Sequence, residues 1–270
     1  MHRNQPLKNN YNMYKEDIEK FRSDENYYGD FKYITNSQLG LLSKSPAHYD
    51  HYRNNPSLRP ETKALKFGRA FHLCMLEPKK FDKQVVVEPD VNKRTKEGKE
   101  IISKFNEDNV GNTILTKDDH GSLIGMRNRL FSSHECMDLL SGGEAELPQA
   151  WRDEDVDVLC KCKADYWNND TKTLVDIKTT TDASPSGFKY SVKKYSYDRQ
   201  SAYYSDGLKA ERFIFIVIEK SPPFNLGIYI CGPELLETGR DKYKFLLQVY
   251  KTYFINKDQD PYDYIHQEII

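Results

Sequence analysis

Residues 161–178 read KCKADYWNNDTKTLVDIK, and this stretch decides the fold. Both of its ends alternate between apolar and charged side chains with the period of two that is typical of β-strands. A turn centred on Asp170 and Thr171 would fold the two strands into an antiparallel hairpin. Asp165 and Asp176 are equally far from that centre. The hairpin would therefore place these two carboxylates directly opposite each other, with Cβ atoms ~4.5–5.5 Å apart.

The strand that precedes this hairpin offers a third carboxylate. Glu146 and Asp165 are equidistant from a turn centred on residues 155–156. Glu146 would then stand in one cross-strand row with Asp165 and Asp176. Adjacent like charges repel, so the row requires a compensating cation, and a divalent metal such as Mg²⁺ prefers oxygen ligands of this kind.

Lys178 lies two residues after Asp176 on the same strand face, roughly 6–7 Å along the strand. An ammonium at that place can stabilise developing negative charge or help to activate a water molecule. A plainer alternative is a solvated sheet face on which Glu, Asp and Lys alternate. The pattern taken alone favours that alternative.

Working outward, the periodicity predicts a mixed α/β fold. Strands are predicted at 144–151, 157–167, 173–179, 212–219 and 225–231, with helices at 186–194, 197–209 and about 234–254. Ahead of them come a peripheral helix or arm at 1–30, short helices within 35–52, a helix at 62–76, a strand at 84–88, a helix ending near 109, and one or two helices at 117–140. The order predicts a central mixed sheet flanked by helices.

We expect an N-terminal helical region over residues 1–110, packed on a core over residues 111–270, the two forming one compact domain. A chain of 270 residues is long enough for this arrangement. Aromatic residues make up 13% of the chain, which a disordered protein rarely reaches.

The net charge of −1 cautions against nucleic-acid binding without excluding it, because metal-binding carboxylates lower the net charge. Five cysteines without a C-x-x-C pair argue against a disulfide framework and suit a reducing compartment. The chain shows neither a signal-peptide pattern near its start nor the ~20 apolar residues of a membrane span. We therefore expect a cytoplasmic protein that has no membrane partner.

Asp165 followed by Asp176-Ile177-Lys178 resembles the D…(D/E)-x-K signature of the PD-(D/E)XK nucleases. Further segments, in the same order along the chain, are similar to motifs of the RecE-type exonucleases of bacteria and prophages. These segments are SPAHY at 45–49, TKALKFGRAFHLCMLEP at 62–78 with Gly68 and His72, RTKEGKE at 94–100, Glu146 ahead of Trp151, KCKADYW at 161–167, DIKTTTDAS at 176–184, and Gln200 with Tyr204. The resemblance covers roughly residues 33–255 and implies a restriction-endonuclease-like core.

The resemblance also implies a metal centre. Asp165 and Asp176 would be metal ligands, His72 would be a further ligand, and the Ile177 carbonyl would face the metal. Glu146 would bind the metal or its water, as the least secure of the carboxylates because Glu144 lies close by. Taken alone, His72 would be a core histidine, since it shares a helix face with apolar residues. The motif around it favours a ligand.

Other residues would serve the reaction or hold DNA. Lys178 would be the catalytic lysine, and Gln200 and Tyr204 would orient it or contact DNA, or would form an ordinary helix surface. Arg94, Lys96 and Lys99 would bind phosphates, with a solvated helix start as the alternative.

Four tyrosines of the same region are candidates for stacking on unpaired bases, although core or interface packing is favoured for most of them: Tyr195, Tyr197, Tyr203 and Tyr204.

Function follows from the resemblance. It implies a Mg²⁺-dependent exodeoxyribonuclease, with Mn²⁺ as a substitute, that degrades linear double-stranded DNA 5′ to 3′ and leaves 3′ single-stranded overhangs for recombination. A homo-oligomeric ring, with a tetramer favoured, a single-strand annealing protein as partner, and a bacterial or phage origin are implied as well. The cysteines lack the arrangement of the related iron–sulfur nucleases, so we expect no cluster. The alternatives are a restriction-like or repair endonuclease of the same superfamily and a non-catalytic DNA-binding scaffold.

Overall fold

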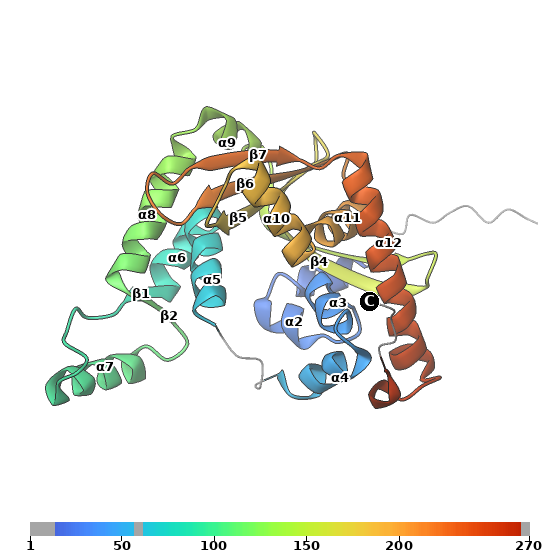
Figure 1. Ribbon diagram of the computed structural model, residues 1–270, viewed down its shortest axis with the longest axis horizontal. Helices are drawn as coiled ribbons and strands as arrows, with labels where there is room; N and C mark the ends of the chain where they lie inside the picture. Colours follow the sequence, from blue (N-terminus) through green and yellow to red (C-terminus); the bar gives the residue numbers. More distant parts are fainter. Residues whose placement is uncertain (1–13, 57–61, 266–270) are drawn as a thin grey trace, which may run out of the picture.

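The structure is a computed structural model that describes residues 14–56 and 62–265 (Figure 1). A five-stranded mixed sheet forms its centre, in the order β3-β4-β5-β6-β7. The strands are β3 (Glu144–Asp153), β4 (Val158–Asn168), β5 (Thr173–Thr180), β6 (Arg212–Glu219) and β7 (Leu226–Ile230). β5 and β6 are parallel and the other neighbours are antiparallel. The predicted hairpin of β4 and β5, the strand before it and the mixed sheet are thus confirmed.

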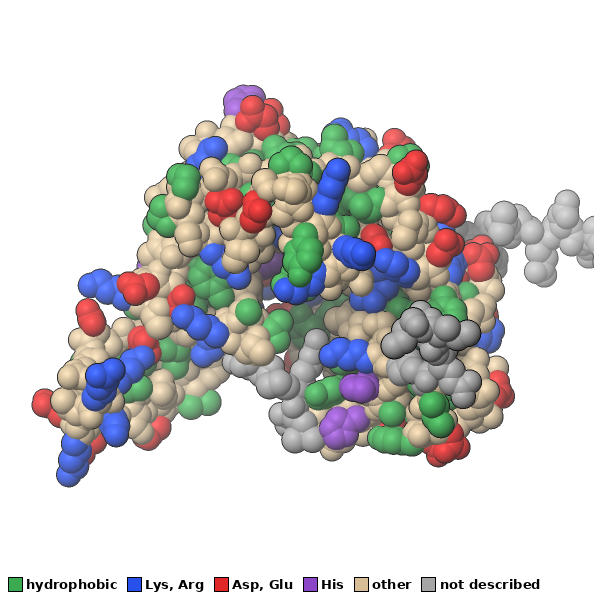
Figure 2. Space-filling view, in the orientation of Figure 1, with side chains coloured by type: hydrophobic (Ala, Val, Ile, Leu, Met, Phe, Trp, Pro, Cys, Tyr) green, Lys and Arg blue, Asp and Glu red, His purple; other side chains and the backbone are tan. Residues whose placement is uncertain are grey.

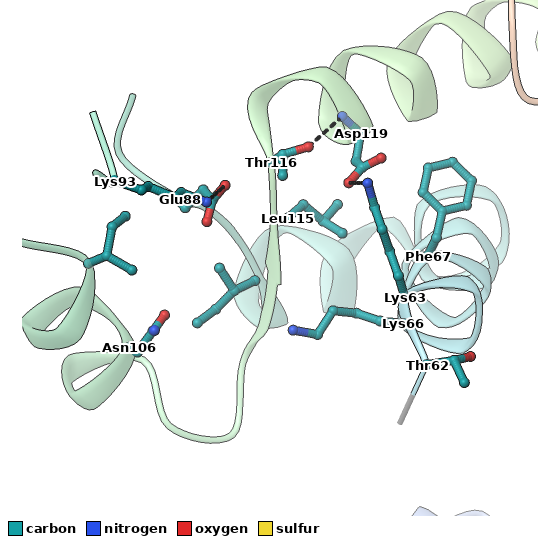
Figure 3. A pocket seen from close by; sticks show the side chains of 12 residues that line it. Thr62, Lys63, Lys66, Phe67, Glu88, Lys93, Asn106, Leu115, Thr116 and Asp119 are labelled. Atoms are coloured by element: carbon teal, nitrogen blue, oxygen red, sulfur yellow. Dashed lines mark hydrogen bonds and ion pairs between the residues drawn. The ribbon is translucent and has the colours of Figure 1, made fainter. Parts of the chain in front are cut away.

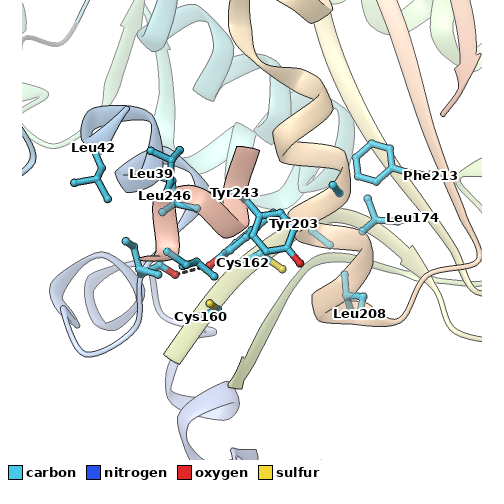
Figure 4. Packing of buried hydrophobic residues seen from close by; sticks show 14 of the residues in the cluster. Leu39, Leu42, Cys160, Cys162, Leu174, Tyr203, Leu208, Phe213, Tyr243 and Leu246 are labelled. Atoms are coloured by element: carbon cyan, nitrogen blue, oxygen red, sulfur yellow. Dashed lines mark hydrogen bonds between the residues drawn. The ribbon is translucent and has the colours of Figure 1, made fainter. Parts of the chain in front are cut away.

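Helices cover both faces of this sheet, and alternate residues of β6 point into two separate cores. Phe213, Phe215 and Val217 belong to a core with α3 (Asn36–Leu42), α4 (Pro46–Asn54), α10 (Pro185–Tyr195), α11 (Tyr197–Leu208) and α12 (Pro233–Tyr250). Figure 4 shows part of this core, where Tyr203 and Tyr243 pack against the cysteines of β4. Ile214, Ile216 and Ile218 belong to the other core, with α5 (Lys63–Leu76), α6 (Pro78–Gln84), α8 (Lys117–Phe131) and α9 (His134–Leu139).

Of the expected peripheral helix or arm, residues 14–30 take the helical form, as two short helices packed against β3 and β4. They form α1 (Lys15–Lys20) and α2 (Asp24–Gly29). Phe21 and Tyr27 are buried there with Ala150 in a third, smaller core. Residues 1–13 of the expected arm lie outside the described residues.

A small parallel pair, β1 (Val85–Val87) with β2 (Thr113–Leu115), flanks α7 (Lys96–Asp108), which projects from the body in Figure 1. Neither β2 nor α6 is predicted from the sequence, and Pro78 begins α6 besides following α5. After α12 the described residues include a π-helical turn (Lys251–Asn256) and a short 3-10 helix (Pro261–Asp263). Of the described helices, none combines the length and the apolar character that a membrane crossing requires.

The strand registers agree with both predicted turn centres. β3 pairs with β4 so that Leu147 lies opposite Ala164, and β4 pairs with β5 so that Tyr166 lies opposite Val175. The next position in each register would align Glu146, Asp165 and Asp176. Neither of those steps forms a regular ladder pair. The β3–β4 ladder skips Glu146 and Asp165 but continues on both sides of them. The β4–β5 ladder extends only from residue 166 to residue 168 of β4.

The two large cores each combine residues from before and after position 110. The division of the chain at that position stays a prediction.

Candidate active site

An imidazole and two carboxylates from three different elements meet beside the sheet. His72 comes from α5, Glu146 from β3 and Asp165 from β4. The Nδ1 atom of His72 lies 3.4 Å from Asp165 Oδ1 and 3.8 Å from Glu146 Oε1. One ligand atom from each residue lies within 4.8 Å of the others. The row of acidic groups predicted from strand register is therefore joined by the histidine that the motif indicates.

α5 is held in place by its own sequence. Thr62 caps its first turn by accepting a hydrogen bond from the backbone N–H of Leu65. Phe71 and Met75 are buried in the core beneath the sheet, next to His72 in the chain. His72 itself keeps 30% of its side chain exposed, so this histidine is not enclosed in the core.

The break in the β4–β5 ladder gives Asp165 a structural partner. Its Oδ2 atom accepts a hydrogen bond of 2.9 Å from the backbone N–H of Ile177. The carboxylate thus satisfies a backbone donor at the point where the two strands part, while Oδ1 faces His72. The role predicted for the Ile177 carbonyl stays a prediction.

Asp176 is fully buried and is held from two sides. Gln200 of α11 donates a hydrogen bond of 2.7 Å from Nε2 to Oδ1, and Lys178 Nζ lies 2.6 Å from Oδ2. Lys178 also lies over the ring of Tyr197, 5.2 Å from its centroid. Gln200 and Asp176 are therefore direct partners, and Asp176 orients Lys178.

Burial and charge shift the pKa values of these groups. Burial lowers the pKa of His72, but the attraction of Asp165 and hydrogen bonds to both carboxylates outweigh it and raise the pKa to about 10. Burial raises the pKa of Asp176 to about 7 against the opposing effect of Lys178. Burial disfavours the charged form of Lys178, yet Asp176 and Asp165 raise its pKa overall. The cluster is a partly buried group of titratable residues with shifted pKa values, which is typical of catalytic centres.

Glu146 has an unusual backbone conformation, with a φ of 53° in the left-handed region. A non-glycine residue there costs on the order of 1–3 kcal/mol and persists where its surroundings impose it. This conformation explains the interruption of the β3–β4 ladder at Glu146. It directs a carboxylate toward His72 from a strand that is otherwise regular.

The alternative of a solvated sheet face is wrong. Asp165 is 8% exposed, Asp176 is 0% exposed, and Lys161 on the same strand is 1% exposed. Buried carboxylates in one cluster are costly without positive charge close by. The protein supplies part of that charge through Lys178 and His72.

The donor set suits a hard divalent cation. Carboxylate oxygens and one imidazole are suitable ligands for Mg²⁺ or Mn²⁺. Asp176 Oδ2 is buried and lacks an aligned hydrogen-bond donor among the described residues, although Lys178 is close. His72, Glu146 and Asp165 are the residues whose ligand atoms already converge. Asp176 lies next to them as a fourth candidate.

The tyrosines predicted to serve the site differ in how far they are buried. Tyr204 of α11 is half-buried, with its ring centroid 6.2 Å from that of Tyr203. Tyr203 is fully buried and donates a hydrogen bond to the Ile34 carbonyl, so it is a core residue. Tyr195 is 55% exposed and Tyr197 is half-buried against Lys178.

The basic strip lies at the start of the projecting helix α7. Arg94, Lys96 and Lys99 are all exposed. Figure 2 shows Lys and Arg side chains on this projection. Phosphate binding by this strip stays a prediction.

Two hollows accompany these elements. A small one of about 90 Å³ opens beside Lys178 and is lined also by Thr179, Thr181 and Lys220. Lys220 is missed by sequence reasoning. It follows β6, which runs parallel to β5 and ends at the same sheet edge, and that pairing is the feature that would have indicated it.

A larger hollow of about 490 Å³ lies between α5, α7 and the start of α8 (Figure 3). Lys63 pairs there with Asp119 at 3.1 Å, and Lys93 pairs with Glu88 at 2.7 Å. It contains none of the carboxylates that face His72.

Comparisons with known proteins give one family and a fold. The family described as "PDDEXK-like domain of unknown function (DUF3799)" matches residues 35–263. A candidate exonuclease from Eubacterium rectale aligns with a TM-score of 0.64 at 15% identity, covering 92% of this chain and 95% of that one. A phage-related exonuclease from Haemophilus somnus aligns with a TM-score of 0.35 at 12% identity, covering 64% and 91%. No curated protein sequence matches the chain. At these identities the structural likeness concerns the fold alone.

Proposed function

The chain belongs to the PDDEXK-like family DUF3799, and from this premise we propose that it is a metal-dependent nuclease acting on DNA. The proposed activity is hydrolysis of phosphodiester bonds from the ends of linear double-stranded DNA. The observation that carries the proposal is the convergence of His72, Glu146 and Asp165, with Asp176 and Lys178 beside them.

His72, Asp165 and Asp176 would hold the metal, and Glu146 would hold it or its water. A bound divalent cation supplies a Lewis acid for the phosphate and lowers the pKa of a coordinated water. The residues of the protein would position the reacting groups. Gln200 fixes one oxygen of Asp176, which in turn holds the Lys178 ammonium in place.

Lys178 contributes a preorganised positive charge next to the cluster. Its side chain is 16% exposed, and Asp176 and the Tyr197 ring flank its ammonium and restrict its movement. A charge held in a largely water-free site stabilises a developing phosphorane more strongly than a solvated one. Because its pKa is raised, Lys178 stays charged, so it would act on the attacking water by orienting it and stabilising its hydroxide form, not by accepting its proton.

The resemblance to RecE-type enzymes extends the proposal. It comprises 5′ to 3′ polarity, 3′ single-stranded products used in recombination, a ring-shaped homo-oligomer with a tetramer favoured, and a single-strand annealing partner. The proposal also places the enzyme in the cytoplasm of a bacterium and includes a phage as the origin of its gene. A ring would gather the basic strips of several copies around DNA, which would reconcile a net charge of −1 with a polyanionic substrate.

The decisive experiment uses linear duplex labelled at the 5′ or the 3′ end, with Mg²⁺ or Mn²⁺. We expect mononucleotide release from 5′ ends, loss of release in Lys178→Ala, and no loss in Lys15→Ala, which removes an exposed lysine of α1. Cleavage of closed circular DNA would instead identify an endonuclease. If the pure protein digests nothing with either metal, the DNA-binding scaffold is the better description.

A further inference from the structure

A second hollow, of about 180 Å³, lies between α2, α3 and α4, and the proposed reaction does not use it. Five of its twelve lining residues are aromatic. They include Tyr28, Phe31 and Tyr52, with Tyr27 and Lys161 at the side of the sheet. We refer to it as the aromatic hollow.

Several aromatic side chains of the aromatic hollow are partly accessible to solvent. Phe31 and Tyr52 are half-buried, and Tyr28 is 69% exposed. The guanidinium of Arg53 lies over the Phe31 ring, 5.9 Å from the centroid. Aromatic and guanidinium planes are the groups on which proteins stack unpaired bases.

The charge of the lining restricts the occupant. Arg53 and Lys161 are its charged residues, and the described lining contains no Asp or Glu. An aromatic cage for a methylated ammonium would need the opposite charge, because two cations would repel such a ligand. The lining instead suits a planar group attached to an anionic chain.

Polar groups at the rim can read the edge of a planar ligand. Ser37 is exposed, and its hydroxyl is 3.1 Å from Thr35 Oγ1. The side-chain carbonyl oxygen of Gln38 takes part in the cap of α3, where it accepts a hydrogen bond of 2.8 Å from the backbone N–H of Thr35. This leaves the Gln38 amide nitrogen as a donor beside the hollow.

The aromatic hollow is connected to the carboxylate cluster through β4. Lys161 precedes Asp165 by four residues, and alternate residues of a strand share a face, so the two are ~13 Å apart along the same face. Tyr27 lines the hollow and contacts the intervening Lys163, whose Nζ lies 5.1 Å from the Tyr27 ring centroid. A distance of ~13 Å equals about four nucleotide steps at the spacing of duplex DNA, and fewer in an extended strand.

We propose that the aromatic hollow binds an unpaired nucleobase of the DNA strand that reaches the carboxylate cluster. Phe31, Tyr52 and Arg53 stack on the base, and Lys161 adds positive charge below it. The inference rests on the proposed nuclease function and adds a base-binding subsite to it. Such a subsite holds the end of the duplex open while the strand is cut.

The test measures binding without cleavage. Linear duplexes carry the fluorescent base 2-aminopurine at successive positions from the 5′ end of one strand, in EDTA. For the wild type we expect a fluorescence change at one or two positions within the first few nucleotides. Phe31→Ala and Tyr52→Ala should each remove that change and weaken binding by about 5- to 150-fold, the effect of losing one stacked base. Phe245→Ala, which truncates a 66% exposed ring on α12, is the matched control and should change neither.

Circular dichroism of each variant distinguishes misfolding from loss of the subsite. The two substitutions lie on different segments, so the test still gives a result if one of the two variants fails to fold. Unchanged fluorescence and affinity in both folded variants would overturn the inference. If these variants still digest labelled duplex like the wild type, the nuclease proposal stands and the subsite does not. If the wild type digests nothing yet shows the position-specific fluorescence change, the nuclease proposal fails and base binding remains.

Discussion

Gly68 lies in the interior of α5, one turn before His72, and its replacement by alanine should separate stability from activity. A Cβ atom at this position would have no described heavy atom within 4 Å. Packing therefore does not require glycine here. Residues four apart share a helix face, so the open space lies on the face of α5 that carries His72.

The stability effect follows from helix propensity. Alanine is favoured over glycine in a helix interior by roughly 0.5–1 kcal/mol. For a protein of this size the change corresponds to a rise of about 1–4 °C in melting temperature. The activity effect has the opposite sign if a DNA backbone uses the space, since a displacement of ~1 Å at a reacting centre can cost on the order of 10²-fold in rate.

The assay combines thermal unfolding with digestion of end-labelled duplex. Gly121→Ala on α8 is the matched control, because it is also a helix-interior glycine with no described atom within 4 Å of a built Cβ. We expect both variants to gain stability and only Gly68→Ala to lose kcat/KM, by roughly tenfold or more. Full activity in a stabilised Gly68→Ala protein would show that no substrate occupies this space. A destabilised Gly68→Ala protein would refute the packing account.

Four further predictions concern charges around the site. Lys178→Ala should lower kcat by about 10²–10³-fold in the duplex assay, and activity equal to the wild type would remove Lys178 from the reaction. Gln200→Leu should leave Asp176 Oδ1 without its donor and lower the unfolding free energy by about 1–3 kcal/mol in urea titrations; no loss would mean that the bond is dispensable. Mn²⁺ should raise the melting temperature of the wild type with increasing concentration but not that of Asp165→Asn, and equal shifts would place the metal elsewhere. Burial lowers the pKa of Lys161 from 10.5 to about 8, so the unfolded chain binds more protons than the folded protein between these two pH values. The free energy of unfolding of the wild type, relative to that of Lys161→Met, should therefore rise across pH 8–10.5. A difference that does not change with pH would contradict the pKa shift.

Strand register is the part of this fold that the sequence predicts best. Two hairpins with short turns leave few ways to align Glu146, Asp165 and Asp176, because a slip of one residue would reverse every side chain. The apolar alternation on both strands agrees with the same choice. The helix caps at Thr35 and Thr62 are likewise local features, and each is formed as the residue types suggest.

Features that depend on distant segments are not predictable in this way. Lys161 lies on the charged side of an alternating strand, yet its ammonium donates to the carbonyls of Tyr27 and Asp30 beneath α2. Only the packing of the N-terminal segment reveals that this face is covered. The contact between Gln200 and Asp176 also spans two elements, and the left-handed backbone of Glu146 has no signature in residue type. β2 has three residues, too few for a periodic pattern.

The candidate site draws its groups from α5, β3, β4, β5 and α11, so its first and last contributors are His72 and Gln200. During synthesis, a chain still lacking α11 and β6 would have neither the amide that fixes Asp176 nor the parallel neighbour of β5. We therefore expect an incomplete chain to be harmless to the DNA of the cell that makes it. The proposed site would be complete only after β6, which ends at Glu219 of 270 residues, has left the ribosome.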